Sequence, residues 1–355
     1  MSRKYRRNTD IDDALLIEIC QRFLDGESRV DTALWLTEVL GRTFTREAVY
    51  AQIKRAVKLG FIRLSPPTNV LLRQRIADQY KQKLTEIHVI DVRGDNARDL
   101  VADAAARHIV ELILKVSRVK KRVCIGLGGG GTVDRVASSL AKYMLKQFDL
   151  PPLAVHALTP GFDPFRPRTS PVSSLGYFDG IVADIEYVSL IANAVVPSEQ
   201  YDEIKSSHGI VDSFKKAREI DIVITSCARA ADEHGELNHF MQVASKDDGD
   251  QTERKLRDAG WVADVTYLPY NELGPITLDD GIRGVTLFEL EDLVTLVRKK
   301  NKHVVLVAAP CAQCHETKVE ALRPLLSQPD TLKLWNHLFL DSRTAQELMP
   351  KEEGE

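Results

Sequence analysis

A run of glycines after an apolar segment is the part of this sequence best suited to hold a charged ligand. Residues 122–127 read Arg-Val-Cys-Ile-Gly-Leu, and four consecutive glycines and Thr132 follow. Glycines leave backbone N–H groups open to a ligand, and a helix beginning near Thr132 adds partial positive charge. A purely structural turn would rarely use five glycines in six positions. The pattern therefore predicts a phosphate or carboxylate site at Gly128, Gly129, Gly130, Gly131 and Thr132.

Two nucleotide-binding motifs overlap this run, and neither fits. Gly126 to Gly131 satisfies G-x-G-x-x-G, but the dinucleotide fingerprint also needs an acidic residue at the end of the next strand, about 20 residues on. That strand, residues 153–159, ends in Pro160-Gly161. A P-loop needs Gly-Lys-Ser/Thr, which does not follow the glycines. A phosphorylated sugar is a better match than a nucleotide, and no bound cofactor is expected.

A second cluster of reactive side chains is Cys311-x-x-Cys314-His315. It formally matches a c-type haem attachment, but residues 1–13 contain no secretory signal, which argues against that interpretation. A zinc site would need further ligands and no second C-x-x-C exists, so we predict no metal site. A redox-sensing pair is an alternative to ordinary packing, because a helix after the preceding strand would lower the pKa of a thiol.

Titratable residues elsewhere keep an enzyme as an alternative. General acid–base chemistry on a sugar needs a donor and an acceptor on either side of it, and Asp232, Glu233, His234 and Lys318 are of suitable types. Their spacing does not define such a pair. Our main prediction is therefore a protein without catalytic residues, and a sugar-phosphate isomerase or deaminase is the alternative.

The N-terminal segment 46–59 has one apolar and one polar face. Val49, Ile53, Ala56 and Val57 recur at three- and four-residue spacing and are expected to pack on neighbouring helices. A DNA-recognition helix needs this division, because its other side presents cationic and hydrogen-bonding groups to bases and phosphates. A protein-interaction helix would share the pattern and remains an alternative. We expect Arg46 and Tyr50 to contact bases or backbone, and Lys54, Arg55 and Lys58 to contact phosphates.

The elements around this helix resemble a small DNA-binding unit. Apolar periodicity predicts helices at residues 11–24, 30–40 and 46–59, with a tight connection between the last two. Residues 61–64 are short and strand-like. Three short helices with a terminal β segment are typical of a helix-turn-helix with a rudimentary wing, which we assign to residues 1–67.

The pattern changes from about residue 71. A connecting helix is expected within residues 68–86, and β and α signals alternate from there on. Strands alternating with helices of this length imply a parallel sheet covered on both faces, that is, a Rossmann-like, mostly parallel α/β domain at residues 87–350. The expected strands are 87–92, 122–127, 153–159, 220–226 and 303–309, and the expected helices include 97–116 and 132–146.

Composition and charge agree with a two-domain globular protein whose front is basic. The 355 residues suit two domains, and 44% hydrophobic with 28% charged residues describe a globular protein. Residues 1–90 carry 16 Lys and Arg against 11 Asp and Glu, a net charge of +5, whereas the remainder carries 32 against 40. The basic part has the sign needed to bind a polyanion. No apolar run reaches the roughly 18 residues of a membrane span, and five cysteines suit a reducing compartment, so we expect a cytoplasmic protein without a membrane partner.

The chain resembles the SorC-type regulators, which are sugar-responsive transcription factors. Their effector domain is related in fold to ribose- and glucosamine-phosphate isomerases. The resemblance is spread over most of the chain. It rests on the helix within residues 49–62, the glycine loop with Thr132, Thr159-Pro160-Gly161, residues 220–226, Ala263-Asp264 before Gly274, Lys318, and residues 336–345.

The resemblance implies roles for particular residues. In such regulators the glycine loop holds the effector's phosphate, and a lysine at the position of Lys318 faces the same pocket. Asp264 matches an acidic residue near the sugar hydroxyls. Gly161 belongs to the predicted site, and Arg166 beyond it would reach a second phosphate. The resemblance also implies a homo-dimer or tetramer that binds two-fold symmetric operator DNA.

Two segments depart from the pattern of these regulators. A Gly-Gly pair usually precedes the lysine, whereas this chain has Ala309-Pro-Cys-Ala-Gln-Cys-His315 there. The loop after Ser226 also lacks the usual glycine-rich turn. The identity of the effector is therefore not fixed by the resemblance.

Overall fold

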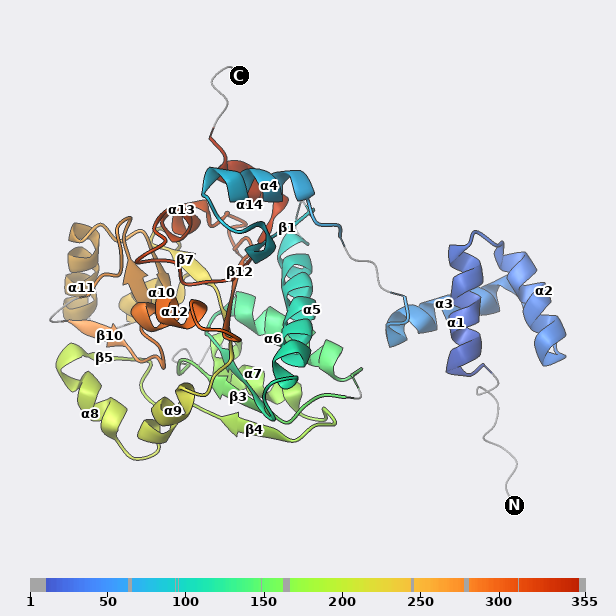
Figure 1. Cartoon of the computed structure of the whole chain (residues 1–355), viewed down its shortest axis with the longest axis horizontal. Helices are drawn as coiled ribbons and strands as arrows, with labels where there is room; N and C mark the ends of the chain where they lie inside the picture. Colours follow the sequence, from blue (N-terminus) through green and yellow to red (C-terminus); the bar gives the residue numbers. More distant parts are fainter. Residues whose placement is uncertain are drawn as a thin grey trace. The chain divides into compact units, whose positions relative to one another are not determined.

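The chain forms two compact units, Met1–Ser65 and Pro66–Glu355 (Figure 1). In the first unit three helices follow one another: α1 (Asp13–Leu24), α2 (Arg29–Leu40) and α3 (Arg46–Leu59). The computed structural model describes residues 11–62, 66–92, 94, 96–147, 149–161, 167–243, 246–277, 281–311 and 313–350, with the side chains of 243 and 246–250 left out.

Local capping explains where the three helices begin and end. Asp12, Ser28 and Thr45 each accept a hydrogen bond from an N–H group in the first turn of the helix they precede. Gly41 and Gly60 end α2 and α3 with φ angles of 64° and 77°, where a side chain would be strained. The predicted helices are therefore confirmed, with α1 starting two residues later than expected.

The core of the first unit holds α3 through one narrow face. Val49, Ile53 and Ala56 are buried against residues of α1 and α2, as predicted. The prediction for Val57 is wrong, because its side chain is 54% exposed. Two short helices cover only one side of α3. Phe61 and Ile62 do not form a strand, and the rest of the expected wing lies outside the described residues.

A parallel sheet of seven strands is the centre of the second unit. The strand order is β1-β12-β11-β6-β2-β3-β4, and all neighbours are parallel, which confirms the predicted α/β fold class. The sequence did not predict β4 and β12 as strands. The strands are β1 (Ile87–Ile90), β2 (Val123–Leu127), β3 (Leu153–Ala157), β4 (Ile185–Val188), β6 (Ile222–Thr225), β11 (His303–Ala308) and β12 (His337–Asp341).

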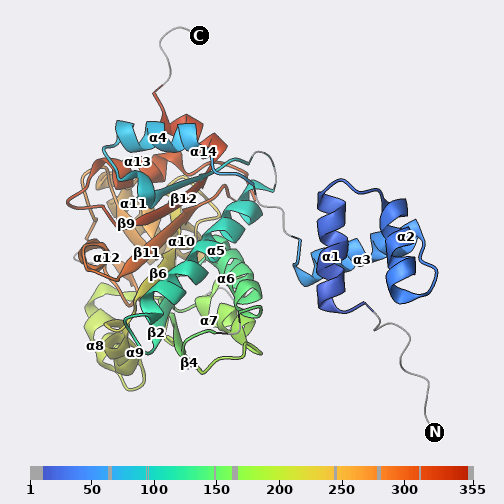
Figure 2. The same cartoon turned by 45° about the vertical axis from the view of Figure 1, so that its right-hand side comes forward.

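Helices cover both faces of this sheet (Figure 2). One apolar cluster joins a sheet face to α5 (Ala97–Ser117) and α6 (Gly131–Met144). A second cluster joins the opposite face to helices from both ends of the unit. The segment expected to connect the units packs within the second one. The helices of this second layer are α4 (Val70–Gln79), α12 (Leu290–Val297), α13 (Val319–Ser327) and α14 (Ser342–Leu348).

Smaller elements surround the edge where the strands end. A three-stranded antiparallel sheet contains β7 (Cys227–Arg229), β8 (Ala263–Val265) and β9 (Leu268–Tyr270), and β5 (Val195–Pro197) pairs with β10 (Ile282–Gly284). None of the described helices has the length and apolar character needed to cross a membrane. The remaining elements are η1 (Leu84–Glu86), η2 (Pro167–Thr169), α7 (Pro171–Ser174), η3 (Leu175–Phe178), η4 (Ser198–Gln200), α8 (Tyr201–Ser206), α9 (Ile210–Ala217), α10 (Glu236–Val243) and α11 (Lys246–Asp258).

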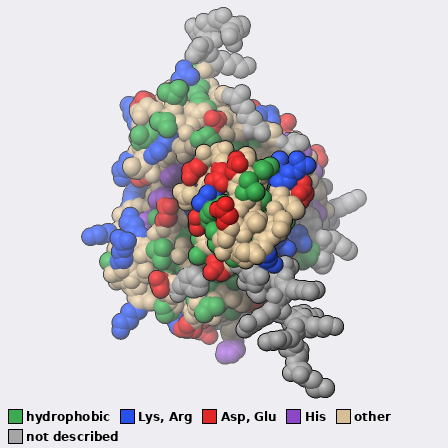
Figure 3. Space-filling view, turned by 90° about the vertical axis from the view of Figure 1, so that its right-hand side faces the viewer, with side chains coloured by type: hydrophobic (Ala, Val, Ile, Leu, Met, Phe, Trp, Pro, Cys, Tyr) green, Lys and Arg blue, Asp and Glu red, His purple; other side chains and the backbone are tan. Residues whose placement is uncertain are grey.

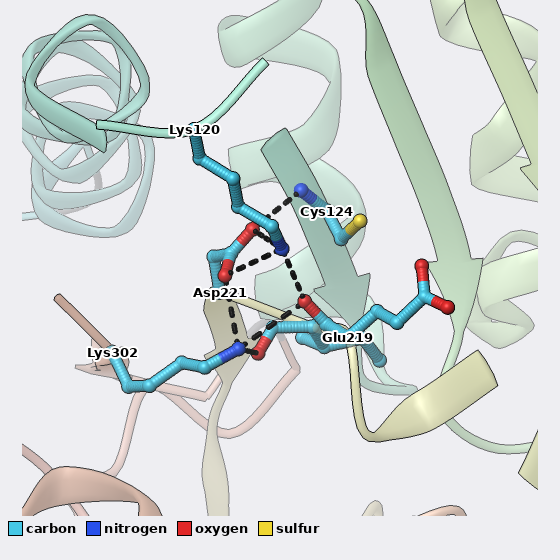
Figure 4. A network of polar contacts seen from close by, with 6 residues as sticks. Lys120, Cys124, Glu219, Asp221 and Lys302 are labelled. Carbon is cyan, nitrogen blue, oxygen red and sulfur yellow. Dashed lines mark hydrogen bonds and ion pairs between the residues drawn. The ribbon is translucent and has the colours of Figure 1, made fainter. Parts of the chain in front are cut away.

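A buried ion cluster ties the amino-terminal ends of the central strands together (Figure 4). Asp221 directly precedes β6, and its side chain is only 4% exposed. Its carboxylate accepts hydrogen bonds from Lys120 Nζ at 2.8 Å, Lys302 Nζ at 2.9 Å and the Cys124 backbone N–H at 3.0 Å. A buried carboxylate with two cations and one N–H donor is well satisfied, so this cluster fixes the register of β2, β6 and β11.

Candidate functional site

A cavity lies where the central strands end. The carboxyl ends of parallel strands meet at one edge of a sheet, which is where ligands bind in open α/β folds. Here β2 leads into the glycine loop, β6 into Ser226, and β11 into the segment that ends at Lys318. Six of the residues predicted for the effector site line this cavity: Gly129, Gly130, Gly131, Thr132, Asp264 and Lys318.

The start of α6 is the anion-binding part of the glycine loop. Gly130 precedes the helix with a φ of 99°, which favours glycine, and its N–H donates to the Thr169 carbonyl at 2.8 Å. The N–H groups of Gly131, Thr132 and Val133 have no acceptor within the helix, because they belong to its first turn. These amides, together with the helix dipole, favour a negatively charged group at the cavity wall.

Two of the predicted glycines are explained by packing instead. Neither Gly128 nor Gly161 lines the cavity. The Gly128 N–H donates to the Ile224 carbonyl at 2.8 Å, and a side chain there would lie 3.2 Å from the same oxygen. At Gly161 a Cβ atom would lie 2.3 Å from the Ser170 side chain. Arg166 lies outside the described residues.

Lys318 and Asp264 place opposite charges in the buried part of the cavity. Both side chains are buried, at 7% and 5% exposure. The Lys318 ammonium donates to Ser226 Oγ at 2.8 Å, and that hydroxyl donates to the Val307 carbonyl at 2.8 Å. Burial raises the pKa of Asp264 to about 7, although the charge of Lys318 acts in the opposite direction. Asp264 is therefore a buried carboxyl group with a raised pKa that lies near the amino group of Lys318.

Several cavity residues were not part of the predicted site. Ser226 follows β6 and positions Lys318, and Asp232 accepts a hydrogen bond from the His234 backbone N–H at 3.0 Å. Arg98, in the first turn of α5, adds a second cation to the wall. The signal for Arg98 and Ser226 was their place just after strands, but the strand order that unites these ends is set by pairing over long sequence distances. Other newly found lining residues are Thr169, Cys227, Ala228, Gly235, Thr266, Tyr267, Cys311 and Gln313, whereas His234 and Glu236 belong to a polar loop that the sequence already suggested could touch the ligand.

A strained turn contributes to the same wall. Thr266 and Tyr267 join β8 to β9 with φ angles of 51° and 66°, in the left-handed region that side chains other than glycine rarely adopt. Both residues line the cavity. Such strain is characteristic of binding sites, where the surrounding structure holds a costly conformation in place. Here the turn begins two residues after Asp264 and contributes two side chains to the lining of the cavity.

The two cysteines after β11 lie at the rim of the cavity. Cys311 is half-buried and lines it, whereas Cys314 is exposed. The expectation that a following helix lowers a thiol pKa is wrong for Cys314, because α13 begins only at Val319 and burial raises the pKa of this thiol. The ligand atoms of Asp232, Cys311 and Cys314 nevertheless lie within 4.8 Å of one another.

On the first unit, the predicted DNA-contacting residues fall into two groups. Tyr50 is 46% exposed, with Lys54 Nζ 4.5 Å and the Arg29 guanidinium 5.7 Å from its ring centre. Lys54 and Lys58 are exposed. Arg29, at the start of α2, was not predicted, and it extends the cationic and aromatic face of α3.

The two other arginines of α3 are engaged within the unit. Arg46 pairs with Glu47 at 2.6 Å on an exposed surface. Arg55 donates to the Ile11 carbonyl at 3.0 Å and lies 3.9 Å from the Asp13 carboxylate. Arg55 therefore holds the start of α1 against α3, in addition to any contact with DNA.

The cationic character of the first unit is local. Apolar side chains such as Val30 and Leu34 of α2 are more than half exposed. On the face shown in Figure 3, acidic, basic and apolar side chains lie next to one another. A polyanion would therefore find concentrated positive charge at the exposed side of α3 and the start of α2, not over the whole unit.

Comparison with known proteins finds relatives by structure. No protein-family model and no curated protein sequence matches the chain. The structure is similar to the full-length sorbitol operon regulator SorC from Klebsiella pneumoniae, with a TM-score of 0.62 and 16% identity over 95% of this chain and 99% of that one. It is also similar to a DeoR family transcriptional regulator from Listeria monocytogenes, with a TM-score of 0.57 and 18% identity over 79% of this chain and 99% of that one. A third similar structure is a domain of a possible sugar-binding transcriptional regulator from Arthrobacter aurescens. Its TM-score is 0.57 and its identity is 17%, over 80% of this chain and 99% of that one.

These matches establish the fold. The Klebsiella regulator covers nearly all of this chain, whereas the other two cover about four fifths of it. All three identities are below 20%, so similarity in sequence does not contribute to the assignment. The chain has the fold of the SorC-type regulators, and the resemblance predicted from its sequence is confirmed at the level of the fold.

Proposed function

We propose that this protein is a DNA-binding transcriptional regulator whose second unit binds a phosphorylated sugar and whose affinity for operator DNA depends on that ligand. One observation carries the proposal. The open amides at the start of α6, the buried ammonium of Lys318 and the carboxyl group of Asp264 all face one cavity. That set combines an anion site with a group suited to sugar hydroxyls.

The chemistry of the cavity favours a ligand with both a phosphate and hydroxyl groups. The helix start supplies N–H donors and partial positive charge for a phosphate, and Arg98 and Lys318 add full charges at the same cavity. Asp264 and Asp232 are buried acceptors for hydroxyl donors. A simple phosphate ion has no hydroxyl groups of the kind that these carboxyl groups could bind, so a phosphorylated sugar uses more of the cavity's polar groups.

The first unit supports DNA as the other partner. Its α2 and α3 form the helix-turn-helix, and the exposed side of α3 presents Tyr50, Lys54 and Lys58. The structurally similar proteins described above are transcriptional regulators, one of them possibly sugar-binding. By analogy we propose a homo-dimer or tetramer acting on a two-fold symmetric operator in the cytoplasm.

The ligand half of the proposal is tested by calorimetry on the full chain. The ligands are ribose 5-phosphate, glucosamine 6-phosphate and deoxyribose 5-phosphate, each compared with its unphosphorylated sugar and with inorganic phosphate. We expect one of the sugar phosphates to bind at least 100-fold more tightly than its unphosphorylated form. If all three phosphorylated sugars bind no better than the free sugars, the ligand class is wrong.

A matched pair of variants identifies the site. Gly131 has open space where a Cβ would lie and, unlike Gly130, no left-handed φ, so a side chain is tolerated there. Gly131→Asp adds a negative charge at the cavity wall and should abolish sugar-phosphate binding, whereas Gly131→Asn adds the same volume without charge and should retain most of it. Equal effects of the two substitutions would argue against an anion at this helix start.

The DNA half is tested with the segment upstream of the protein's own gene. Fluorescence anisotropy should give a specific complex whose affinity changes at least tenfold on adding the sugar phosphate that binds. Failure of the chain to bind this DNA more tightly than a random duplex at the same salt concentration would favour a protein-interaction role for the first unit.

One observation favours the alternative, a sugar-phosphate isomerase or deaminase. An acid whose pKa is near 7 beside a buried lysine is also a usable proton-transfer pair. The same sugar phosphates should therefore be followed for product formation. Turnover that is lost in Asp264→Asn would replace the regulator by the enzyme, whereas binding without turnover supports the regulator.

A further inference from the structure

A cluster of imidazoles lies in the second unit, away from the effector cavity. His88 of β1, His108 of α5, His303 of β11 and His337 of β12 are four of the nine histidines of the chain. His303 and His337 open their strands, whereas the cavity lies where the strands end. The sheet register pairs His88 with Phe339, so the residues on β1 and β12 share the face that α5 covers.

The rings are close enough to share one ligand. His108 Nε2 lies 3.0 Å from His337 Nδ1, and one nitrogen of His88 completes a set whose members all lie within 4.8 Å of one another. The His88 ring stacks on Phe339 at 4.3 Å, which fixes its plane. Tetrahedral zinc with Zn–N bonds of about 2.0–2.1 Å separates its ligand nitrogens by roughly 3.3 Å, so the three nitrogens need to move by only about an ångström to bind one ion.

Contacts outside the three nitrogens are compatible with the tautomers that a cation needs. His337 Nε2 lies 3.0 Å from His303 Nδ1, and His108 Nδ1 lies 3.5 Å from the Glu111 carboxylate. A ring that donates its outer N–H to such a partner turns the lone pair of its other nitrogen inward, which is the usual second contact of metal-bound histidine. The His88 Nε2 atom is buried and has no hydrogen-bond partner among the described residues.

Cations near the cluster bear on whether it can hold a divalent ion, because like charges repel. The nearby cation Lys115 is exposed, where solvent and salt screen its charge.

We propose that His88, His108 and His337 form a binding site for a late first-row divalent cation such as Zn²⁺, separate from the effector cavity. Three imidazole nitrogens without thiolate or carboxylate in the first shell suit zinc, nickel or copper and disfavour magnesium and calcium. Three protein ligands leave one position of a tetrahedral ion for water. The ion would join α5 to the neighbouring strands β1 and β12 and so stabilise this part of the second unit.

The test uses the full chain without an affinity tag, stripped of metal with a chelator. Calorimetric titration with ZnCl₂ should give one site per chain, and an excess of about 100 times Kd should raise the melting temperature of the second unit by roughly 5 °C. Co²⁺ should give the visible bands of a tetrahedral nitrogen site without a thiolate charge-transfer band. No Zn²⁺ binding to the folded wild-type chain would overturn the proposal.

Variants decide which residues hold the ion. His108→Gln with His337→Gln should remove the site, and His88→Gln alone should weaken it at least tenfold; circular dichroism without metal verifies their folding. His208→Gln, at an exposed histidine, is the matched control and should bind as the wild type does. Cys311→Ser with Cys314→Ser should also bind normally, and loss of the ion in that variant would place it with Asp232 and the cysteines instead.

Discussion

Two buried aspartates lie near opposite ends of the central strands, Asp221 just before β6 and Asp264 in β8 of the small antiparallel sheet, and their charges are compensated differently. Asp221, at the amino-terminal edge, has two lysines and a backbone N–H around its carboxylate (Figure 4). Asp264, at the carboxyl edge, has Lys318 nearby, but the ammonium of Lys318 donates to Ser226. Burial dominates at Asp264 and raises its pKa to about 7.

The number of partners around each carboxyl group distinguishes a cluster that stabilises the fold from one that can bind a ligand. A buried charge that is fully hydrogen-bonded fixes the structure around it and has little capacity left for a ligand. A buried acid and a lysine that are not paired with each other keep donors and acceptors for a molecule that enters later. Charged residues in the interior are therefore informative about function only once their partners are known.

The largest effect on stability is expected when the hydrogen-bonded carboxylate of Asp221 is removed. Asp221→Ala leaves Lys120, Lys302 and the buried Cys124 N–H without this carboxylate acceptor, and breaking such a cluster typically costs about 3–5 kcal/mol. Denaturant unfolding of the second unit, followed through its tryptophans Trp261 and Trp335, measures this loss. Asp184→Ala is the control, because Asp184 pairs with Arg122 at a 70% exposed position and should cost less than about 1 kcal/mol. Similar losses in both variants would remove the distinction between the two kinds of pair.

The pH dependence of stability should reveal Asp264. Its folded-state pKa, about 7, is above the value of 3.8 expected without burial. A raised pKa means that the folded protein binds the proton more tightly, so the contribution of Asp264 to stability is present below pH 4 and is lost as pH rises through 7. In Asp264→Asn this loss is absent. The difference in unfolding free energy, wild type minus variant, should fall by about 2–4 kcal/mol between pH 4 and pH 8.

This measurement also tests whether Asp264 differs from Asp221 in the way its charge is compensated. Half-buried histidines such as His88 and His337 act with the opposite sign, since their lowered pKa values destabilise the fold as pH falls. Subtracting the variant from the wild type cancels that background. A flat difference curve would mean that Asp264 is ionised throughout and paired as Asp221 is.

A smaller effect, on ligand affinity rather than folding, is expected at the cavity lysine. Lys318→Met keeps the length of the side chain but removes the charge that a phosphate or the ionised Asp264 would meet. Affinity for the sugar phosphate should fall about 30-fold, the equivalent of about 2 kcal/mol. Calorimetry at constant ionic strength measures it, and Lys120→Met, at the amino-terminal edge, should leave the affinity unchanged.

The regions that could be predicted from the sequence are those set by local interactions. The helix ends at Gly41 and Gly60 and the glycine loop before Thr132 follow from short-range capping and backbone freedom. Apolar spacing wrongly predicted that Val57 is buried, because the buried face of α3 is narrower than the face marked by its apolar residues.

Non-local features escaped prediction. β12 lies between β1 and β11 although more than 240 residues separate it from β1, and no local signal encodes that place. The cavity residues Arg98 and Ser226 follow strands whose neighbours were unknown from the sequence. The cluster of His88, His108 and His337 also depends on long-range pairing, which is why counting ligand spacings along the chain led to no metal site.

The smallest effect on folding, and a distinct effect on binding, is expected at the exposed lysines of α3. Lys54 and Lys58 lie on the surface, so replacing either by Ala should change stability by less than about 0.5 kcal/mol. If each ammonium neutralises one DNA phosphate, each substitution should reduce the slope of log K against log salt by about 0.9. Arg55→Ala is the informative comparison, because Arg55 also holds Ile11 and should lose stability as well as affinity. An unchanged slope in the Lys54→Ala, Lys58→Ala double variant would remove this face of α3 from the DNA interface, while leaving the ligand cavity of the second unit untouched.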